Sequence, residues 1–169
     1  MSFTVEDGTR PLGANSYSTV EAADAYHADR GNAAWALASL AQKQAALVSA
    51  TDYVDRANNF IGWRSTQPQS LMWPRYDAWD EDGRLLLGVP TKVIQAVQEY
   101  ALRALSAPLA PDPVYDSTGG LVTRKVEKVG PIEEETFFSE RMPIEIRAYP
   151  MADALLRFLT RPLGEIHRG

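Results

Sequence analysis

The chain has 169 residues, no cysteine and a formal net charge of −5, with 45% hydrophobic and 23% charged residues. This size and composition are typical of one soluble globular domain that buries its own core. The lack of cysteine excludes disulfides and thiolate metal sites. The net acidity excludes a protein that binds polyanions over its whole surface, although a local basic patch remains compatible with it.

The N-terminal segment has no basic region followed by an apolar run, so no signal peptide is predicted. No apolar stretch approaches the roughly 18 residues that a membrane span needs. We therefore expect the protein to be made and kept in a cytoplasm, at least until it assembles into a larger structure.

Residues 1–17 are predicted to be extended, and two helices are predicted after them. Ser18 and Glu21 have the spacing of a capping box, so a helix is expected to begin there and to end at Gly31. Asn32 is placed to cap a short helix that includes Trp35.

The stretch 39–64 predicts a long helix around which we expect the other segments to pack. Ser39 and Gln42 form a second capping box. Apolar side chains then recur every three to four residues, which is one face of a helix, and Gly62 ends the pattern. The apolar positions are Leu40, Leu47, Val54 and Ile61.

Residues 65–90 contain prolines and glycines that forbid a long helix, yet they are rich in apolar side chains. We expect an irregular loop packed on the helices. Residues 91–106 return to a helical pattern, with Val93 and Val97 on a wide apolar stripe and Glu99 and Arg103 on the opposite, polar face.

Composition changes again after residue 106. A linker is predicted first, and two β-branched, charged stretches around Gly130 then predict a β-hairpin or two extended arms. Pro150 is placed at the first position of a last helix, whose apolar face is formed by Met151, Leu155, Phe158 and Leu159. The basic arm residues are expected to lie opposite the acidic ones and to support contacts between subunits: Arg124, Lys125 and Lys128 against Glu133, Glu134 and Glu135.

The predicted fold class is therefore mainly α. We expect a compact bundle of four to five helices with an extended β-hairpin or arm inserted before the C-terminal helix. The whole chain is expected to be a single domain. Residues 18–106 would form the helical core, 107–148 the linker and arm, and 149–169 the C-terminal helix and tail.

No catalytic, cofactor or metal site is predicted. The two histidines, His27 and His167, stand alone, and no phosphate-binding loop or nucleophile elbow is present. The acidic turn around Gly83 resembles a calcium loop, but Ala78 and Val89 occupy positions where oxygen ligands are required. We therefore expect a protein that is not an enzyme.

One stretch combines aromatic residues with arginines, which is typical of surfaces that stack bases and hold phosphates of single-stranded nucleic acid. Its candidate residues are Trp63, Arg64, Trp73, Arg75, Tyr76 and Trp79. Four acidic residues between positions 77 and 82 oppose this interpretation, because a groove that follows a nucleic acid strand should be locally positive. Tryptophans of this kind also often serve core packing.

Several segments in the same order along nearly the whole chain resemble a family of small proteins from tailed phages. Members of this family look like head–tail connector adaptors, and some carry the label of DnaT-like proteins that bind single-stranded DNA (ssDNA). The matching segments are GANSYSTVEAADAYHADRGNAAW, AALVSATDYVDR, the step Gly62-Trp63-Arg64, LMWPR, VPTKVIQAVQEYALRAL, KVGPIEEE and YPMADALL.

The resemblance implies a head-completion protein at the virion neck, assembled in the bacterial host cytoplasm. It would form a homo-oligomeric ring, twelve-fold by family analogy, between the portal protein and a stopper or tail-completion protein. Packaged double-stranded DNA would pass through its channel without sequence-specific binding. The tail residues expected to contact the portal are Arg157, Arg161 and Arg168. The alternative is an ssDNA-binding module in phage DNA replication, which would use the aromatic and arginine residues above.

Overall fold

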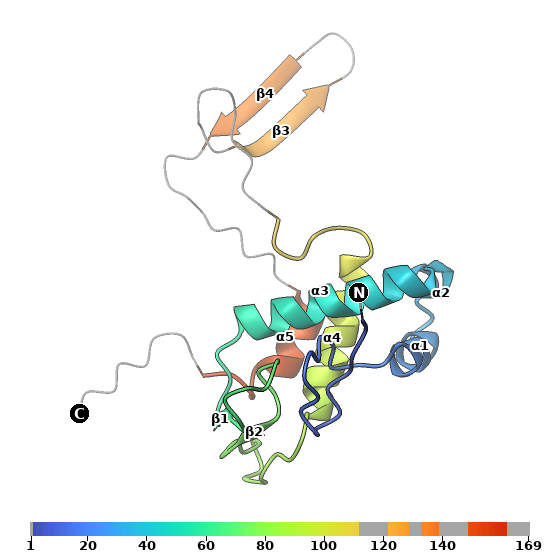
Figure 1. The fold of residues 1–169 in the computed structure, drawn as a ribbon. Helices are drawn as coiled ribbons and strands as arrows, with labels where there is room; N and C mark the ends of the chain where they lie inside the picture. The colour runs from blue at the N-terminus through green and yellow to red at the C-terminus, as the bar shows by residue number, and fades with distance from the viewer. Residues whose placement is uncertain (1, 112–121, 129–132, 139–148, 162–169) are drawn as a thin grey trace, which may run out of the picture. The chain divides into compact units, whose positions relative to one another are not determined.

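The computed structural model describes residues 2–111, 122–128, 133–138 and 149–161 (Figure 1). The chain divides into two compact units, one of Met1–Leu109 with Ala148–Gly169 and the other of Ala110–Arg147. The expected fold class is confirmed, because the described residues form five helices and a two-stranded antiparallel hairpin between the fourth and fifth helices.

The first unit contains all five helices and one short β-ribbon. The helices are α1 (Val20–Ala28), α2 (Ala33–Leu37), α3 (Leu40–Ala57), α4 (Thr91–Ala104) and α5 (Pro150–Leu156). The ribbon pairs β1 (Trp63–Arg64) with β2 (Arg75–Tyr76) in antiparallel register. No helix within the described ranges is long and apolar enough to cross a membrane.

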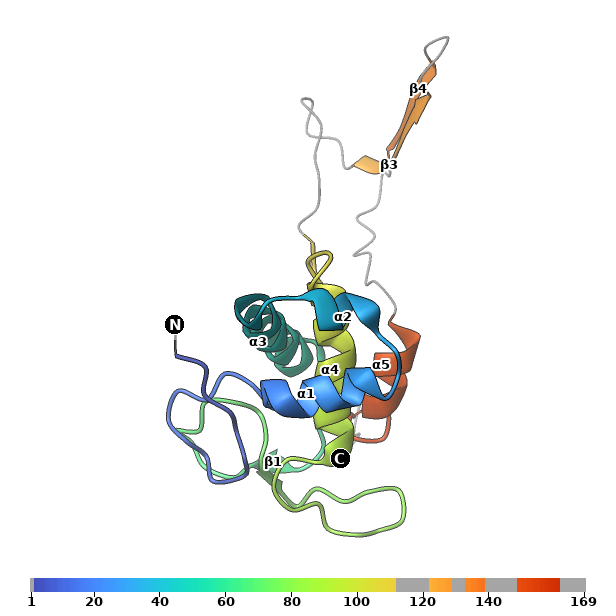
Figure 2. The ribbon, with the colours of Figure 1, turned by 90° about the vertical axis from the view of Figure 1, so that its right-hand side faces the viewer.

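Helix α4 is the central helix of this unit, in place of the long helix expected from the sequence. It packs against α3, α5 and α1 (Figures 1 and 2). Its buried residues surround most of its circumference and include Val93, Val97 and Tyr100. The β1–β2 ribbon lies near the N-terminal end of α4, and α2 lies near its C-terminal end (Figures 1 and 2).

Helix α3 confirms the predicted capping box and most of the predicted apolar face. The Ser39 hydroxyl accepts a hydrogen bond from the backbone N–H of Gln42, and the Gln42 side-chain oxygen accepts one from the backbone N–H of Ser39. Leu47 and Val54 are fully buried, whereas Leu40 in the first turn is 61% exposed. The helix ends at Ala57, earlier than expected, because Asn58 has extended backbone and its amide caps the Val54 carbonyl at 2.9 Å.

Glu99, which was expected on the polar face of α4, is buried beneath α1 together with Gln98. Glu99 accepts hydrogen bonds from the Tyr26 hydroxyl at 3.0 Å and from Arg103 at 2.6 Å. Gln98 donates to the hydroxyl of Ser18. Ser18 is therefore used in the core, and Thr19 caps α1 in its place.

Helix α5 begins at Pro150 as predicted, but the helix is rotated from the expected orientation. Ala152, Leu156 and Leu159 are buried, while Met151 and Phe158 are exposed. The small side chain of Ala152 faces the core, and the longer side chain of its neighbour Met151 is exposed to solvent.

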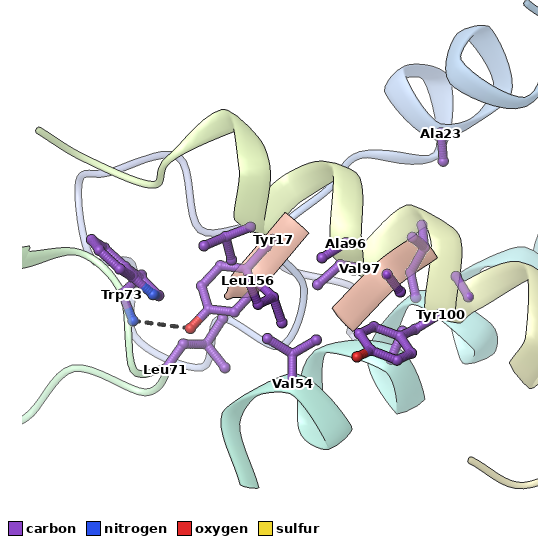
Figure 3. Packing of buried hydrophobic residues seen from close by; sticks show 14 of the residues in the cluster. Tyr17, Ala23, Val54, Leu71, Trp73, Ala96, Val97, Tyr100 and Leu156 are labelled. Atoms are coloured by element: carbon purple, nitrogen blue, oxygen red, sulfur yellow. Dashed lines mark hydrogen bonds between the residues drawn. The ribbon is translucent and has the colours of Figure 1, made fainter. Parts of the chain in front are cut away.

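A network of hydrogen bonds joins the N-terminal segment, α3 and the loop before β2. The Tyr17 hydroxyl donates to Asp55 at 2.7 Å and accepts the backbone N–H of Trp73 at 2.9 Å. The other Asp55 oxygen accepts the backbone N–H of Met72 at 2.9 Å. Figure 3 shows Tyr17 among core side chains with its bond to Trp73. Because burial raises the pKa of Asp55 to about 6, this carboxyl holds its proton more tightly in the folded protein than in water.

The second unit contains β3 (Val122–Lys128) and β4 (Glu133–Phe138), paired antiparallel. The expected opposition of charges holds for Lys128, which is paired with Glu133. It does not hold for Arg124 and Lys125, whose partners are Phe137 and Thr136. Of the remaining acidic residues, Glu134 lies opposite Glu127 and Glu135 lies opposite Val126. The register therefore pairs a basic with an acidic residue only at Lys128 and Glu133 among the residues expected to do so.

We predict that Leu47→Ala lowers the free energy of unfolding by about 2–5 kcal/mol, because it leaves a cavity at a fully buried position. Leu40→Ala, on the same helix but largely exposed, should change it by less than about 0.5 kcal/mol. Denaturant unfolding of both variants measures the difference. Equal losses would contradict the packing of α3 described here.

We also predict that Asp55 makes stability fall as pH rises. The pKa is 3.8 for an ordinary aspartate and about 6 in the fold, so its contribution is full below about pH 4 and lost as pH rises through about 6. The loss amounts to at most about 3 kcal/mol.

Unfolding measured between pH 4 and 7 tests this contribution. The difference between wild type and Asp55→Asn should show the fall with rising pH, because asparagine cannot ionise. Asp52→Asn, an exposed change on the same helix, is the matched control and should retain most of the wild-type profile. Parallel profiles for wild type and Asp55→Asn would refute the prediction.

Candidate nucleic-acid interface

The β1–β2 ribbon follows directly from the end of α3 and is held by the end of the described chain. The backbone N–H of Ile61 donates to the Leu159 carbonyl at 3.0 Å, and that of Arg161 donates to the Asn59 carbonyl at 2.8 Å. A bridge between Phe60 and Thr160 lies between these bonds. The segment after α5 therefore extends along the residues that lead into β1.

Gly62 permits the tight turn into β1. Its φ is +67°, a conformation that favours glycine. A Cβ added there would lie 2.5 Å from the Tyr76 carbonyl oxygen and 2.9 Å from the backbone N of Ala78. The backbone after β2 therefore packs directly on Gly62, and a side chain at this position would separate the two strands.

Arg75 lies beneath the ribbon with its guanidinium bound to backbone. Its Nε donates to the Ile61 carbonyl at 2.7 Å and its Nη2 to the Gly62 carbonyl at 2.8 Å. Burial lowers the pKa of Arg75, with the nearby positive charge of Arg161 as a further cause. The guanidinium satisfies carbonyls that the turn leaves without strand partners.

Trp73 is also interior. It is fully buried and packs edge-to-face on Phe60, with ring centroids 5.6 Å apart. Trp73 and Arg75 were candidates for stacking bases and holding phosphate. The structure corrects this assignment, because the ring and the guanidinium are both committed to the fold.

Three exposed residues of the ribbon and one from the segment after α5 form the surface that we call the hairpin face: Trp63, Arg64, Tyr76 and Arg161. Trp63 and Tyr76 are directly opposed Cα partners, so their side chains leave the same side of the ribbon. They are 55% and 56% exposed. The guanidinium carbon of Arg161 lies 5.3 Å from the Trp63 ring centroid, within the range of a cation–π contact.

Arg64 and Arg161 give the hairpin face two positive charges, and none of its four members is acidic. Arg64 is exposed and one of its guanidinium nitrogens donates to the Gln67 carbonyl at 2.9 Å. Arg161 donates to the Gly62 carbonyl at 3.3 Å. Each guanidinium is therefore positioned by one protein carbonyl and has further donors for an anion.

Trp79 belongs to a different local structure. It is 50% exposed, and its indole N–H donates to Asp77 at 2.9 Å. A bridge to Leu85 closes an acidic turn, in which the Asp80 carboxylate accepts the backbone N–H groups of Asp82 and Arg84. Three of the four acidic residues that opposed nucleic acid binding in the sequence, those at positions 80–82, thus lie in this turn, whereas Asp77 directly follows Tyr76.

The other candidate residues lie apart from the hairpin face. Arg157 stacks on the exposed ring of Phe158 at 4.7 Å. Arg168 lies outside the described residues, and so do the side chains of the arm residues 122–128 and 133–138. No sequence pattern joins Arg161 to Trp63, because only the strand-like contact of residues 159–161 with 59–61 brings them together.

His27 has a structural role. Its Nε2–H donates to the Gln98 carbonyl at 3.1 Å, so its Nδ1 accepts from the Asn32 amide at 3.0 Å. Burial lowers the pKa of His27, which keeps the ring neutral. No cluster of histidine or carboxylate side chains suited to a metal ion occurs in the part of the chain that the structure describes.

Comparison with known proteins gives one family match. The family model covers residues 1–169 and is described as "Putative DnaT-like ssDNA binding protein". No curated protein and no solved structure matches the chain.

This match corrects the role that the phage resemblance implied. A head–tail connector, portal-binding adaptor or virion neck ring was expected, whereas the matching family is described by ssDNA binding. The description agrees with the alternative function, and nothing in the match supports a portal, a stopper or a ring as partner. Since the family model spans the chain from end to end, the protein belongs to the family described as putative DnaT-like ssDNA-binding proteins.

Proposed function

We propose that this protein binds single-stranded DNA on the hairpin face, without catalysing a reaction. The observation that carries the proposal is the directly opposed pair of Trp63 and Tyr76, both more than half exposed, beside two arginines. The family description supports DNA as the ligand.

Exposed aromatic rings on paired strands suit single-stranded nucleic acid because every base has a π-face that can stack on them. In a duplex the faces of the bases are already stacked on neighbouring bases, so the aromatic rings of the ribbon cannot stack on them. Stacking also explains why the ligand need not have a particular sequence.

The arginines supply the electrostatic part of the binding. Arg161 lies over the Trp63 ring, so a backbone phosphate next to a base stacked on Trp63 is within reach of its guanidinium. Arg64 is the strand partner of Arg75 and leaves the other side of the ribbon, so its exposed guanidinium adds positive charge at the edge of the stacking surface. The chain as a whole carries a charge of −5. Binding is therefore confined to this local patch and should be sensitive to salt.

Loss of the stacking rings is the first test. Trp63→Ala and Tyr76→Ala should each weaken binding of an end-labelled oligothymidylate of about eight nucleotides by roughly 5- to 100-fold, the range expected for one lost stacking contact. Fluorescence anisotropy at low salt measures the affinity.

Phe158→Ala is the control, because it removes a half-exposed aromatic ring that lies apart from the hairpin face. It should leave affinity within about twofold of wild type, since that ring is not a proposed stacking contact. No binding by the wild-type protein at low salt would refute the proposed function. An equal loss in Phe158→Ala would remove the assignment to the hairpin face.

Salt dependence is the second test. Arg64→Gln and Arg161→Gln should each lower the slope of log affinity against log salt concentration by about 0.7, the value for one phosphate contact on a single strand. Arg56→Gln removes the same charge from an exposed position on α3 and should leave the slope unchanged. Slopes that fall equally in all three variants would show a general charge effect and contradict the contacts proposed here.

A further inference from the structure

A hollow of about 270 Å³ lies beside the hairpin face. Its lining comes from the N-terminal turn (Gly8 and Arg10), from Ser65 and residues 74–77 of the ribbon, and from residues 85–88. Tyr76 belongs to both surfaces, so the hollow and the hairpin face are continuous.

Unusual backbone is concentrated around this hollow. Arg10 and Asp77 have φ values of 65° and 53°, and they are the only non-glycine residues with positive φ in the described part of the chain. Both line the hollow. Such conformations cost of order 1–3 kcal/mol each and are retained where surrounding structure holds them, often at binding sites.

The turn that carries Arg10 is held from inside the protein. Glu6 is 2% exposed, and one of its carboxylate oxygens accepts the backbone N–H groups of Gly8 at 2.8 Å and Arg10 at 2.9 Å. Arg10 itself is exposed. A buried carboxylate thus fixes the backbone from which an exposed guanidinium projects at the edge of the hollow.

The chemistry of the lining matches a base and a phosphate. Pro74 and the leucines at 85–87 contribute apolar surface, Tyr76 contributes an aromatic ring, and Arg10 contributes a positive charge. The carboxylate of Asp77 is occupied by the Trp79 indole. Pockets for drug-sized ligands hold about 300–1,000 Å³, so this hollow of about 270 Å³ suits a small ring such as a nucleobase.

We propose that the hollow takes a single unstacked base of the bound strand, while Arg10 contacts an adjoining phosphate. This inference rests on the proposed function, since the strand must first bind on the hairpin face. It adds a second, recessed subsite to the flat stacking surface.

Two variants test the subsite independently. Ser65→Leu narrows the hollow, and its backbone N–H keeps the bond to the Pro74 carbonyl. Arg10→Asn removes the guanidinium, and asparagine tolerates the positive φ. Arg56→Asn, at an exposed position on α3, is the control for the lost charge. Unfolding midpoints confirm that each variant is folded before binding is measured.

Two probes separate base binding from phosphate binding: oligothymidylate of about eight nucleotides and an abasic deoxyribose-phosphate oligomer of the same length. Ser65→Leu should weaken binding of oligothymidylate by roughly 5- to 100-fold and leave binding of the abasic oligomer unchanged. Arg10→Asn should weaken both and lower the salt slope by about 0.7, whereas Arg56→Asn should not.

The subsite is refuted if Ser65→Leu binds both oligomers as wild type does, or weakens both equally. It is also refuted if Arg10→Asn behaves as Arg56→Asn. These outcomes are distinct from a failure of the proposed function, in which wild type binds neither oligomer and Trp63→Ala changes nothing.

Discussion

The hydrogen bonds of Tyr17 and Asp55 are the constraint on which the rest of the structure depends. Asp55 leaves α3 near its end, Tyr17 leaves the N-terminal segment, and together they fix the backbone of Met72 and Trp73. The loop between α3 and α4 has little regular structure of its own. Binding its backbone to a buried carboxyl and a phenol gives it a defined path over the core.

That path determines which side of the ribbon faces solvent. With Trp73 fixed in the core, β2 begins at Arg75 pointing inward, and strand alternation then turns Tyr76 outward. The opposed residue, Trp63, is turned outward by the same register. The hairpin face therefore follows from the position of Trp73, and the buried residues of the loop act on the binding surface only by orienting it.

The sequence predicted what local chemistry determines. The capping box at Ser39, the left-handed Gly31 and the start of α5 at Pro150 all depend on a few neighbouring residues, and all three are present. Positions that depend on distant partners were harder to predict. Glu99 resembles a surface residue of an amphipathic helix, and it is buried because Tyr26 and Arg103 satisfy its carboxylate.

The candidate site shows the same division. The aromatic and arginine content of the loop indicated nucleic acid binding, but composition did not separate the exposed Trp63 and Tyr76 from the buried Trp73 and Arg75. The exposed and the buried residues are separated by the register of two strands of two residues each, and strands this short leave almost no pattern in a sequence. The place of Arg161 depends on the contact of residues 159–161 with the segment after α3, which no local rule supplies.

The second unit leaves and re-enters the first at neighbouring points. The Tyr149 hydroxyl donates to the Leu109 carbonyl at 3.2 Å, so the chain is already closed on itself just outside Ala110–Arg147. A core whose ends are joined in this way pays little entropy for the length of the segment between them. The second unit is thus an insertion whose length places little demand on the packing of the helices.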